Sequence, residues 1–259
     1  MNEEAISSCA LPHHADKWCS IVWRKIIQGV SRLQRRIAKA VKEGRWGRVK
    51  ALTYLVSKSY YAKLLAVFRV TTNKGGKTPG VDVIVWRNDE DKIKAAGSLK
   101  TRGYSPKPLR RVYILKRNGK KRPLSIPTMH DRAMQALLAI ALDPVAETTA
   151  DPNSYGFRRK RSCADAIAQC FISLCQKSSA QWILEADIKS CFDEISHDWI
   201  LEHIPLDKTI LRKWLKAGFM EKKKLFPTAK GTPQGGIISP TIMNMVLDGL
   251  EPILKNKFP

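Results

Sequence analysis

Residues 182–193 read Trp-Ile-Leu-Glu-Ala-Asp-Ile-Lys-Ser-Cys-Phe-Asp, and residues 232–240 read Thr-Pro-Gln-Gly-Gly-Ile-Ile-Ser-Pro. The first stretch predicts a central strand over residues 182–187, because a short apolar run bounded by polar residues is typical of a buried strand. The second predicts a glycine-rich turn and then a helix that begins at Ser239-Pro240. Together they favour an α+β fold in which a carboxylate, Asp187, ends the central strand.

The charge of the chain is strongly positive and clustered. Its 259 residues carry a formal charge of +23, and 44% of them are hydrophobic, which is enough to build a core. Between Lys17 and Thr78 there are 16 Lys or Arg against one acid, Glu43, and residues 100–123 hold ten with no acid. A single basic run is usually a solvated surface. Two such runs indicate a polyanionic partner, above all nucleic acid.

The cysteines and the apolar segments narrow the class of protein further. No Cys-x-x-Cys pair occurs among the six cysteines, which argues against a zinc site. Cys163 and Cys170 are expected to be small core residues, as in a reducing compartment. Residues 1–15 do not resemble a secretory signal, and residues 133–142 are too short an apolar stretch to span a bilayer. We therefore expect a cytoplasmic protein without a membrane partner.

Helical periodicity and turn signals predict the remaining elements. The expected helices cover residues 18–41, 45–67, 83–102, 128–142, 162–177 and 207–219. Thr128 with Asp131, and Ser162 with Asp165, resemble capping boxes at the starts of two of them. Asn118-Gly119 predicts a basic β-hairpin between residues 111–116 and 121–126. The chain then divides into a flexible tail (1–16), a helical extension (17–104) and an α+β part (105–259).

Three positions combine into a candidate site for phosphoryl transfer. Such chemistry uses metal ions held by several carboxylates, and Asp187 at a strand end is suited to be the first ligand of Mg²⁺. An acid there is more often a turn or cap residue. Phe192 lies where a ring could exclude a 2′-hydroxyl, although alone it is simply a core residue. Gln234, between Pro233 and two glycines, is free to hydrogen-bond a ligand, or it belongs to a plain turn.

Basic residues elsewhere supply candidate phosphate contacts. Lys116 and Arg122, on the expected hairpin, could reach a triphosphate, although such residues are often only solvated. Arg158 and Arg159 alternate with aromatic residues, as expected along a primer or template strand. An exposed basic loop explains them equally well. The basic helical pair adds the further RNA-binding candidates Arg32, Arg35, Arg36, Lys39, Arg45, Arg48 and Lys50.

Taken in order, several motifs resemble one family. They are Arg110-Arg-Val-Tyr-Ile114, Lys121-Arg-Pro-Leu-Ser-Ile-Pro-Thr128, Asp131-Arg-Ala-Met-Gln135, Asn153-Ser-Tyr-Gly-Phe-Arg158 and the two stretches quoted above. This order resembles bacterial group II intron-encoded reverse transcriptase/maturases. The resemblance runs from about Trp18 to the end of the chain. It implies right-hand polymerase fingers and an incomplete palm, with a basic helical N-terminal extension.

The resemblance also implies an activity and its site. It implies Mg²⁺-dependent DNA synthesis on an RNA template from a DNA primer and dNTPs, and binding to group II intron RNA. By position, Asp187 corresponds to the first catalytic metal ligand and Ile188 to a residue whose carbonyl assists it. Phe192 corresponds to the sugar-sensing ring, and Gln234, Lys116 and Arg122 correspond to nucleotide contacts.

The sequence departs from the family pattern at several positions, and these differences lead to two functional hypotheses. The family continues into a Tyr-Ala-Asp-Asp hairpin with two further metal ligands, and no Asp-Asp pair occurs in this sequence. We therefore expect a truncated form with an incomplete two-metal site that is inactive alone and complemented by a C-terminal polypeptide. Ala186 and Val83 stand where glycine is usual, and Leu115 where proline is usual. The alternative hypothesis is a non-catalytic remnant that binds or helps to fold intron RNA.

Overall fold

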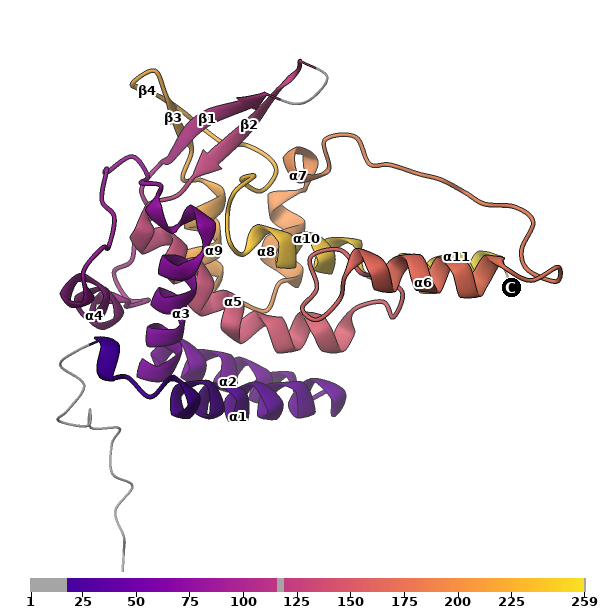
Figure 1. The fold of residues 1–259 in the computed structure, drawn as a ribbon, viewed down its shortest axis with the longest axis horizontal. Coiled ribbons are helices and arrows are strands. Elements are labelled where there is room, and N and C mark those ends of the chain that lie inside the picture. The colour runs from indigo at the N-terminus through magenta and orange to yellow at the C-terminus, as the bar shows by residue number, and fades with distance from the viewer. Residues whose placement is uncertain (1–17, 116–118, 259) are drawn as a thin grey trace, which may run out of the picture.

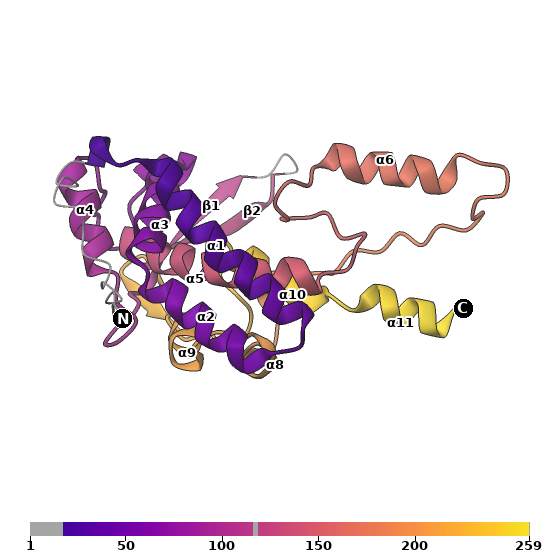
Figure 2. The same cartoon turned by 90° about the horizontal axis from the view of Figure 1, so that it is seen from below.

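The computed structural model describes residues 18–115 and 119–258. The expected tail of residues 1–16, together with Lys116 and Asn118 of the expected hairpin, lies outside the described residues. Within the described part, a helical body carries one four-stranded sheet, which confirms the α+β class (Figure 1). An elongated arm extends from this body, as Figure 2 shows from a second side.

Helix α5 (Met129–Thr149) forms the centre of the body. Nearly every side chain between Met129 and Leu142 is buried, because helices α1, α2 and α3 all pack against it. A helix that is apolar on all sides is stable only when it is enclosed in this way. The predicted cap is confirmed: Thr128 Oγ1 accepts a hydrogen bond from the Asp131 amide at 3.1 Å. The helix also continues past the expected end, to Thr149.

The N-terminal helices differ from the expected pair. A 3₁₀ turn at Trp18–Ser20 precedes α1 (Trp23–Lys42), and α2 (Trp46–Lys58) follows. The single helix expected over residues 45–67 is wrong, because the extended residue Ser59 ends α2 and caps α3 (Tyr60–Thr72). Both helices face α5, so the apolar periodicity continues across the break. A second 3₁₀ turn (Lys74–Lys77) then leads through an irregular segment to α4 (Asp89–Ser98), which is shorter than expected.

The sheet has the strand order β2-β1-β3-β4. Strands β1 (Leu109–Leu115) and β2 (Lys121–Ile126) pair antiparallel, with Arg111 opposite Ser125, which confirms the predicted hairpin. Strand β3 (Phe219–Glu221) runs parallel to β1 and antiparallel to β4 (Lys224–Phe226). The four strands lie above the N-terminal end of α5 (Figure 1).

The helix expected over residues 207–219 is only half correct. Helix α9 (Lys208–Leu215) begins one residue after the expected start, with Asp207 as its N-cap, but it ends four residues early. Gly218 has φ +67, and a Cβ there would lie 2.6 Å from the carbonyl oxygen of Phe226. The backbone needs this close approach to enter β3. The sequence does not predict strand β3 here, because its partner strand, β1, lies more than a hundred residues away in the chain.

The arm overturns the prediction of a central strand. It consists of α6 (Cys163–Leu174) and residues 175–190, and it returns to the body at the short α7 (Cys191–Glu194) (Figure 1). Residues 182–187 are not in a strand. Trp182 is 93% exposed, and no described strand is hydrogen-bonded to this segment. An apolar segment is stable as a buried strand only where neighbouring strands form hydrogen bonds with its amide and carbonyl groups. Cys163 and Cys170 are exposed on α6, so the prediction that they are core residues is also wrong.

Three further helices complete the described chain. Helix α8 (His197–His203) packs against α9, and α10 (Ser239–Leu247) packs against α5. Helix α10 begins at the predicted Ser239-Pro240 and has Pro at its N-terminus. Helix α11 (Leu250–Lys257) contributes no buried residue and extends on the same side as the arm (Figure 2). Among the described residues, no helix has the length and apolar character that crossing a membrane requires.

Candidate nucleotide and nucleic-acid site

The Gln234 loop is tied to strand β2 by its backbone. The carbonyl oxygen of Gln234 accepts a hydrogen bond from the Ser125 amide at 2.8 Å. Gly235 has φ +112, and a Cβ there would meet the Ser125 carbonyl oxygen at 2.6 Å. On the other side, the buried Gln135 of α5 accepts a hydrogen bond from the Ile237 amide. The loop is thereby held between the hairpin and the central helix.

This anchoring brings two predicted nucleotide contacts together. Arg122 Nε donates to Gln234 Oε1 at 3.1 Å, across 112 residues of sequence. Arg122 itself is exposed, so its remaining N–H groups are available to an anionic ligand. Lys116, the third predicted contact, lies outside the described residues.

Phe192 is placed next to the same loop. The carbonyl oxygen of Phe192 accepts a hydrogen bond from the Thr232 amide at 2.7 Å, two residues before Gln234. Its half-buried ring meets the Phe157 ring edge-on, with centroids 6.3 Å apart. The Gln234 loop therefore lies between α7 and the hairpin, bonded to the Phe192 backbone on one side and to the Arg122 side chain on the other.

Asp187 and Ile188 lie on the exposed segment that leads into α7. Burial and then the negative charge of Asp187 raise the pKa of Cys191. Throughout residues 18–115 and 119–258, no three His, Cys, Asp or Glu side chains converge as metal ligands. The described residues therefore do not by themselves form a complete metal site.

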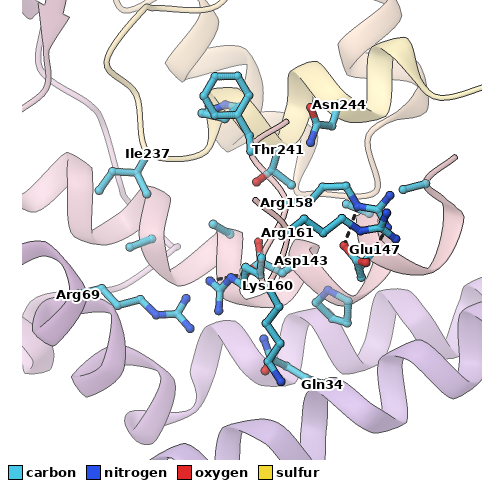
Figure 3. A pocket seen from close by; sticks show the side chains of 18 of the residues that line it. Gln34, Arg69, Asp143, Glu147, Arg158, Lys160, Arg161, Ile237, Thr241 and Asn244 are labelled. Atoms are coloured by element: carbon cyan, nitrogen blue, oxygen red, sulfur yellow. Dashed lines mark hydrogen bonds and ion pairs between the residues drawn. The ribbon is translucent and has the colours of Figure 1, made fainter. Parts of the chain in front are cut away.

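A cavity of about 740 Å³ lies between α1, α3, α5, α10 and the loop of residues 157–161 (Figure 3). Arg69 extends into it from α3, and Lys160 and Arg161 contribute from the loop. Burial and then the charge of Arg159 lower the pKa of Arg69 to about 10, although Asp143 opposes this. Burial also raises the pKa of Asp143, despite the two arginines. The cavity is therefore rich in partly desolvated positive charge.

The two loop arginines chosen from the sequence differ in role. Arg158 donates to both carboxylate oxygens of Glu147, at 3.0 and 2.6 Å, and to the carbonyl oxygens of Asp151 and Ser154. Its side chain is only 6% exposed, so it holds the loop together rather than facing a nucleic acid. An RNA contact at Arg158 therefore stays a prediction, and its donors are engaged within the loop in this structure. Arg159 pairs with Asp143 at 2.5 Å but stays more than half exposed.

The helical pair presents the predicted basic surface. All seven predicted side chains are exposed, on α1, on α2 or, for Arg45, in the turn between them: Arg32, Arg35, Arg36, Lys39, Arg45, Arg48 and Lys50. Lys39 and Arg45 share Glu43, at 3.8 and 3.3 Å. Such exposed ion pairs contribute little to the stability of the fold, and with one acid among so many cations the surface stays strongly positive.

Sequence reasoning missed Arg69, Lys160 and Arg161 as cavity residues. Arg69 was counted only as one charge in a basic run, although its half-buried position on an apolar helix sets it apart. Its neighbour Arg159 lies 90 residues away in the sequence, so no local pattern could have joined them. Gln135, which orients the Gln234 loop, carried no signal either.

A basic hairpin thus carries Arg122 against a Pro-Gln-Gly-Gly loop, and exposed basic helices belong to the same body, an arrangement compatible with a nucleotide polymerase. Comparison with known families agrees. Residues 18–99 match the N-terminal domain of reverse transcriptase, and residues 114–258 match the reverse transcriptase (RNA-dependent DNA polymerase) family. The chain belongs to the reverse transcriptase family, whose members generally use divalent metal ions.

Individual relatives sharpen this assignment. The chain is 38% identical over 217 residues to the group II intron-encoded protein LtrA of Lactococcus lactis, covering 79% of this chain and 35% of LtrA. It is 31% identical over 243 residues to YkfC of Escherichia coli, covering 88% and 63%. A putative COX1/OXI3 intron 1 protein of Saccharomyces cerevisiae is 32% identical over 71% of the chain and 23% of its own length. The chain thus spans about a third of LtrA.

Proposed function

We propose that this chain supplies the fingers and part of the palm of a group II intron reverse transcriptase, which copies RNA into DNA and binds its intron RNA as a maturase. The pairing of Arg122 with Gln234 carries the proposal, because it joins two nucleotide contacts of the family that lie 112 residues apart. The family match and the exposed basic helices support it.

The proposed roles follow the contacts described above. Arg122, Gln234 and Lys116 contact the incoming dNTP, and the Phe192 ring disfavours a 2′-hydroxyl. Asp187, assisted by the Ile188 carbonyl, supplies one ligand for Mg²⁺, and the remaining carboxylates come from polypeptide beyond the described residues. That polypeptide would pair with residues 182–187, whose exposed apolar side chains and free backbone suit a strand partner.

Primer extension on an RNA template with Mg²⁺ tests the catalytic part of the proposal. We expect residues 1–259 alone to give no extension, because the described carboxylates do not converge. Adding a polypeptide that covers the rest of a related palm should restore extension for the wild type but not for Asp187→Ala. Extension by the chain alone that is lost in Asp187→Ala would contradict the incomplete site.

The second candidate function is RNA binding without catalysis. The exposed basic surface of α1 and α2 favours it, since this surface needs no metal site. Asp187→Ala should then leave RNA affinity unchanged. If the chain binds RNA but no mixture with an added palm polypeptide extends a primer, RNA binding without catalysis is favoured over the polymerase function.

A charge-matched pair of variants tests the RNA surface itself. Replacing Arg32, Arg35 and Arg36 by Gln should weaken RNA binding and lower the salt slope by about two to three, since each phosphate contact contributes roughly 0.7–0.9. The control variant replaces Lys222, Lys223 and Lys224, which are exposed on the β3–β4 turn, and should leave the slope unchanged. Equal slopes for the two variants would contradict a specific role for α1.

A further inference from the structure

A hollow lies where α2 meets α5 and the turn between α8 and α9. Its volume is about 480 Å³, and its lining includes Trp46, Tyr54 and Leu206. The two aromatic side chains are not enclosed by the protein: Trp46 is 52% exposed and Tyr54 is 62% exposed. Large exposed rings at the edge of a hollow are typical of a binding surface rather than of a core.

The rings alternate with cations along one side of α2. Trp46, Lys50, Tyr54 and Lys58 follow one another at intervals of four residues, so they form one stripe on the helix surface. We call these four residues the α2 stripe. Lys58 Nζ lies 5.1 Å from the centre of the Tyr54 ring. All four side chains are exposed.

Charge complementarity limits what the stripe can bind. Burial lowers the pKa of Lys63, and the nearby charges of Lys58 and Lys100 lower it further. None of these three lysines has an ion-pair partner within the described ranges. Asp207 is the carboxylate among the hollow's lining residues, and its Oδ1 already accepts two amide hydrogen bonds at the start of α9. The surface therefore favours an anionic ligand.

We propose that the α2 stripe binds an unpaired segment of RNA, with bases stacked on Trp46 and Tyr54 and backbone phosphates beside Lys50 and Lys58. This inference rests on the proposed RNA-binding function and adds the chemical form of the RNA. Alternating rings and cations match the alternation of base and phosphate in a single strand. In a duplex the base faces are stacked on each other and out of reach, so single strands bind better here.

The test compares a labelled 20-nucleotide single-stranded RNA with a duplex of the same sequence, by fluorescence anisotropy with the full chain. Tyr54→Ala should weaken single-strand binding roughly ten-fold, since one stacked base contributes that order of affinity. Tyr54→Phe keeps the ring and should bind like the wild type. Leu55→Ala, also exposed on α2 but outside the hollow, serves as the matched control and should change nothing.

Two further readouts separate stacking from charge. Lys50→Gln should lower the salt slope by about one, whereas Tyr54→Ala should leave the slope unchanged. RNA that carries 5-iodouridine should crosslink on irradiation to the peptide containing Trp46 or Tyr54. Mass spectrometry of the crosslinked peptide identifies the residue.

The outcomes distinguish this inference from the proposed function. A wild-type chain without salt-sensitive RNA binding would overturn the RNA-binding function. Wild-type binding that Tyr54→Ala leaves intact, without crosslinks to α2, would overturn only the stacking site. If Tyr54→Ala instead abolishes self-association measured by sedimentation, the hollow binds protein and the inference is wrong.

Discussion

Gly235 shows how one residue sets the position of the nucleotide loop. Gly235→Ala places a Cβ 2.6 Å from the Ser125 carbonyl oxygen at φ +112, so the loop must move away from β2. We expect a loss of about 1–3 kcal/mol in the free energy of unfolding, measured in urea. Gly97→Ala is the control. Outside the neighbouring backbone of α4, no atom lies within 4 Å of a Cβ placed at Gly97, so this change should stabilise α4 by about 0.5–1 kcal/mol. Equal effects of the two changes would contradict this role.

Val83 is a strained residue with a left-handed backbone conformation. Its φ of +59 is unfavourable for a β-branched side chain, and the side chain is 77% exposed, so little packing would be lost with it. Val83→Gly should therefore stabilise the protein by up to about 1 kcal/mol, less than the full strain because glycine is freer when unfolded. Val83→Ala keeps a Cβ and should give a smaller change. A destabilised Val83→Gly variant would argue against strain here.

The Cys191 thiol reports on the position of Asp187. Because burial and the charge of Asp187 raise its pKa, Cys191 should react with iodoacetamide with a midpoint at higher pH than an ordinary thiol. Asp187→Asn removes the negative charge, so the pKa should fall and the midpoint should move to lower pH. Peptide mass spectrometry follows each cysteine separately, and the midpoint does not depend on steric access. An unchanged midpoint would place Asp187 away from α7.

At the scale of elements, two helix caps of similar sequence should have unequal effects. Thr128 is buried, caps α5, and donates to Asp131 Oδ2 at 2.7 Å, so Thr128→Ala should cost about 1–2 kcal/mol. Ser162 caps α6 with a complete capping box, but α6 buries no residue. Ser162→Ala should therefore leave global unfolding within about 0.5 kcal/mol. Circular dichroism against urea measures both, and equal costs would show that α6 unfolds together with the body.

Elements that depend on local sequence could be predicted, whereas those that depend on distant contacts could not. The caps Thr128 and Ser162 and the hairpin depend on neighbouring residues, and the structure confirms each of them. Helix α10 begins at Ser239 itself, one residue before its predicted first position, with Ile238 as its N-cap. The break at Ser59 and the end of α9 depend on partners far away in the sequence. Residues 182–187 had the composition of a strand, but composition supplies no partner strand.

At the scale of the whole molecule, the arm should make the isolated chain associate. Phe171, Trp182 and Leu184 are exposed on α6 and on the segment that follows it, and α11 buries nothing. Apolar surface of this kind favours contacts between copies. Sedimentation velocity should show concentration-dependent association, which Trp182→Lys with Leu184→Lys should reduce. A monomer with one sharp unfolding transition would contradict this expectation.

The sequence by itself determined the class of the chain, its basic helical layer, the hairpin and its reverse transcriptase motifs, because charge, periodicity and capping are local properties. It also supplied Arg122 and Gln234 as separate candidates. Only the tertiary structure decided that these two meet, that Arg158 is used inside its own loop while Arg69 extends into the cavity, and that the expected strand is exposed. The physical reason is that burial and pairing depend on contacts between residues far apart in the chain.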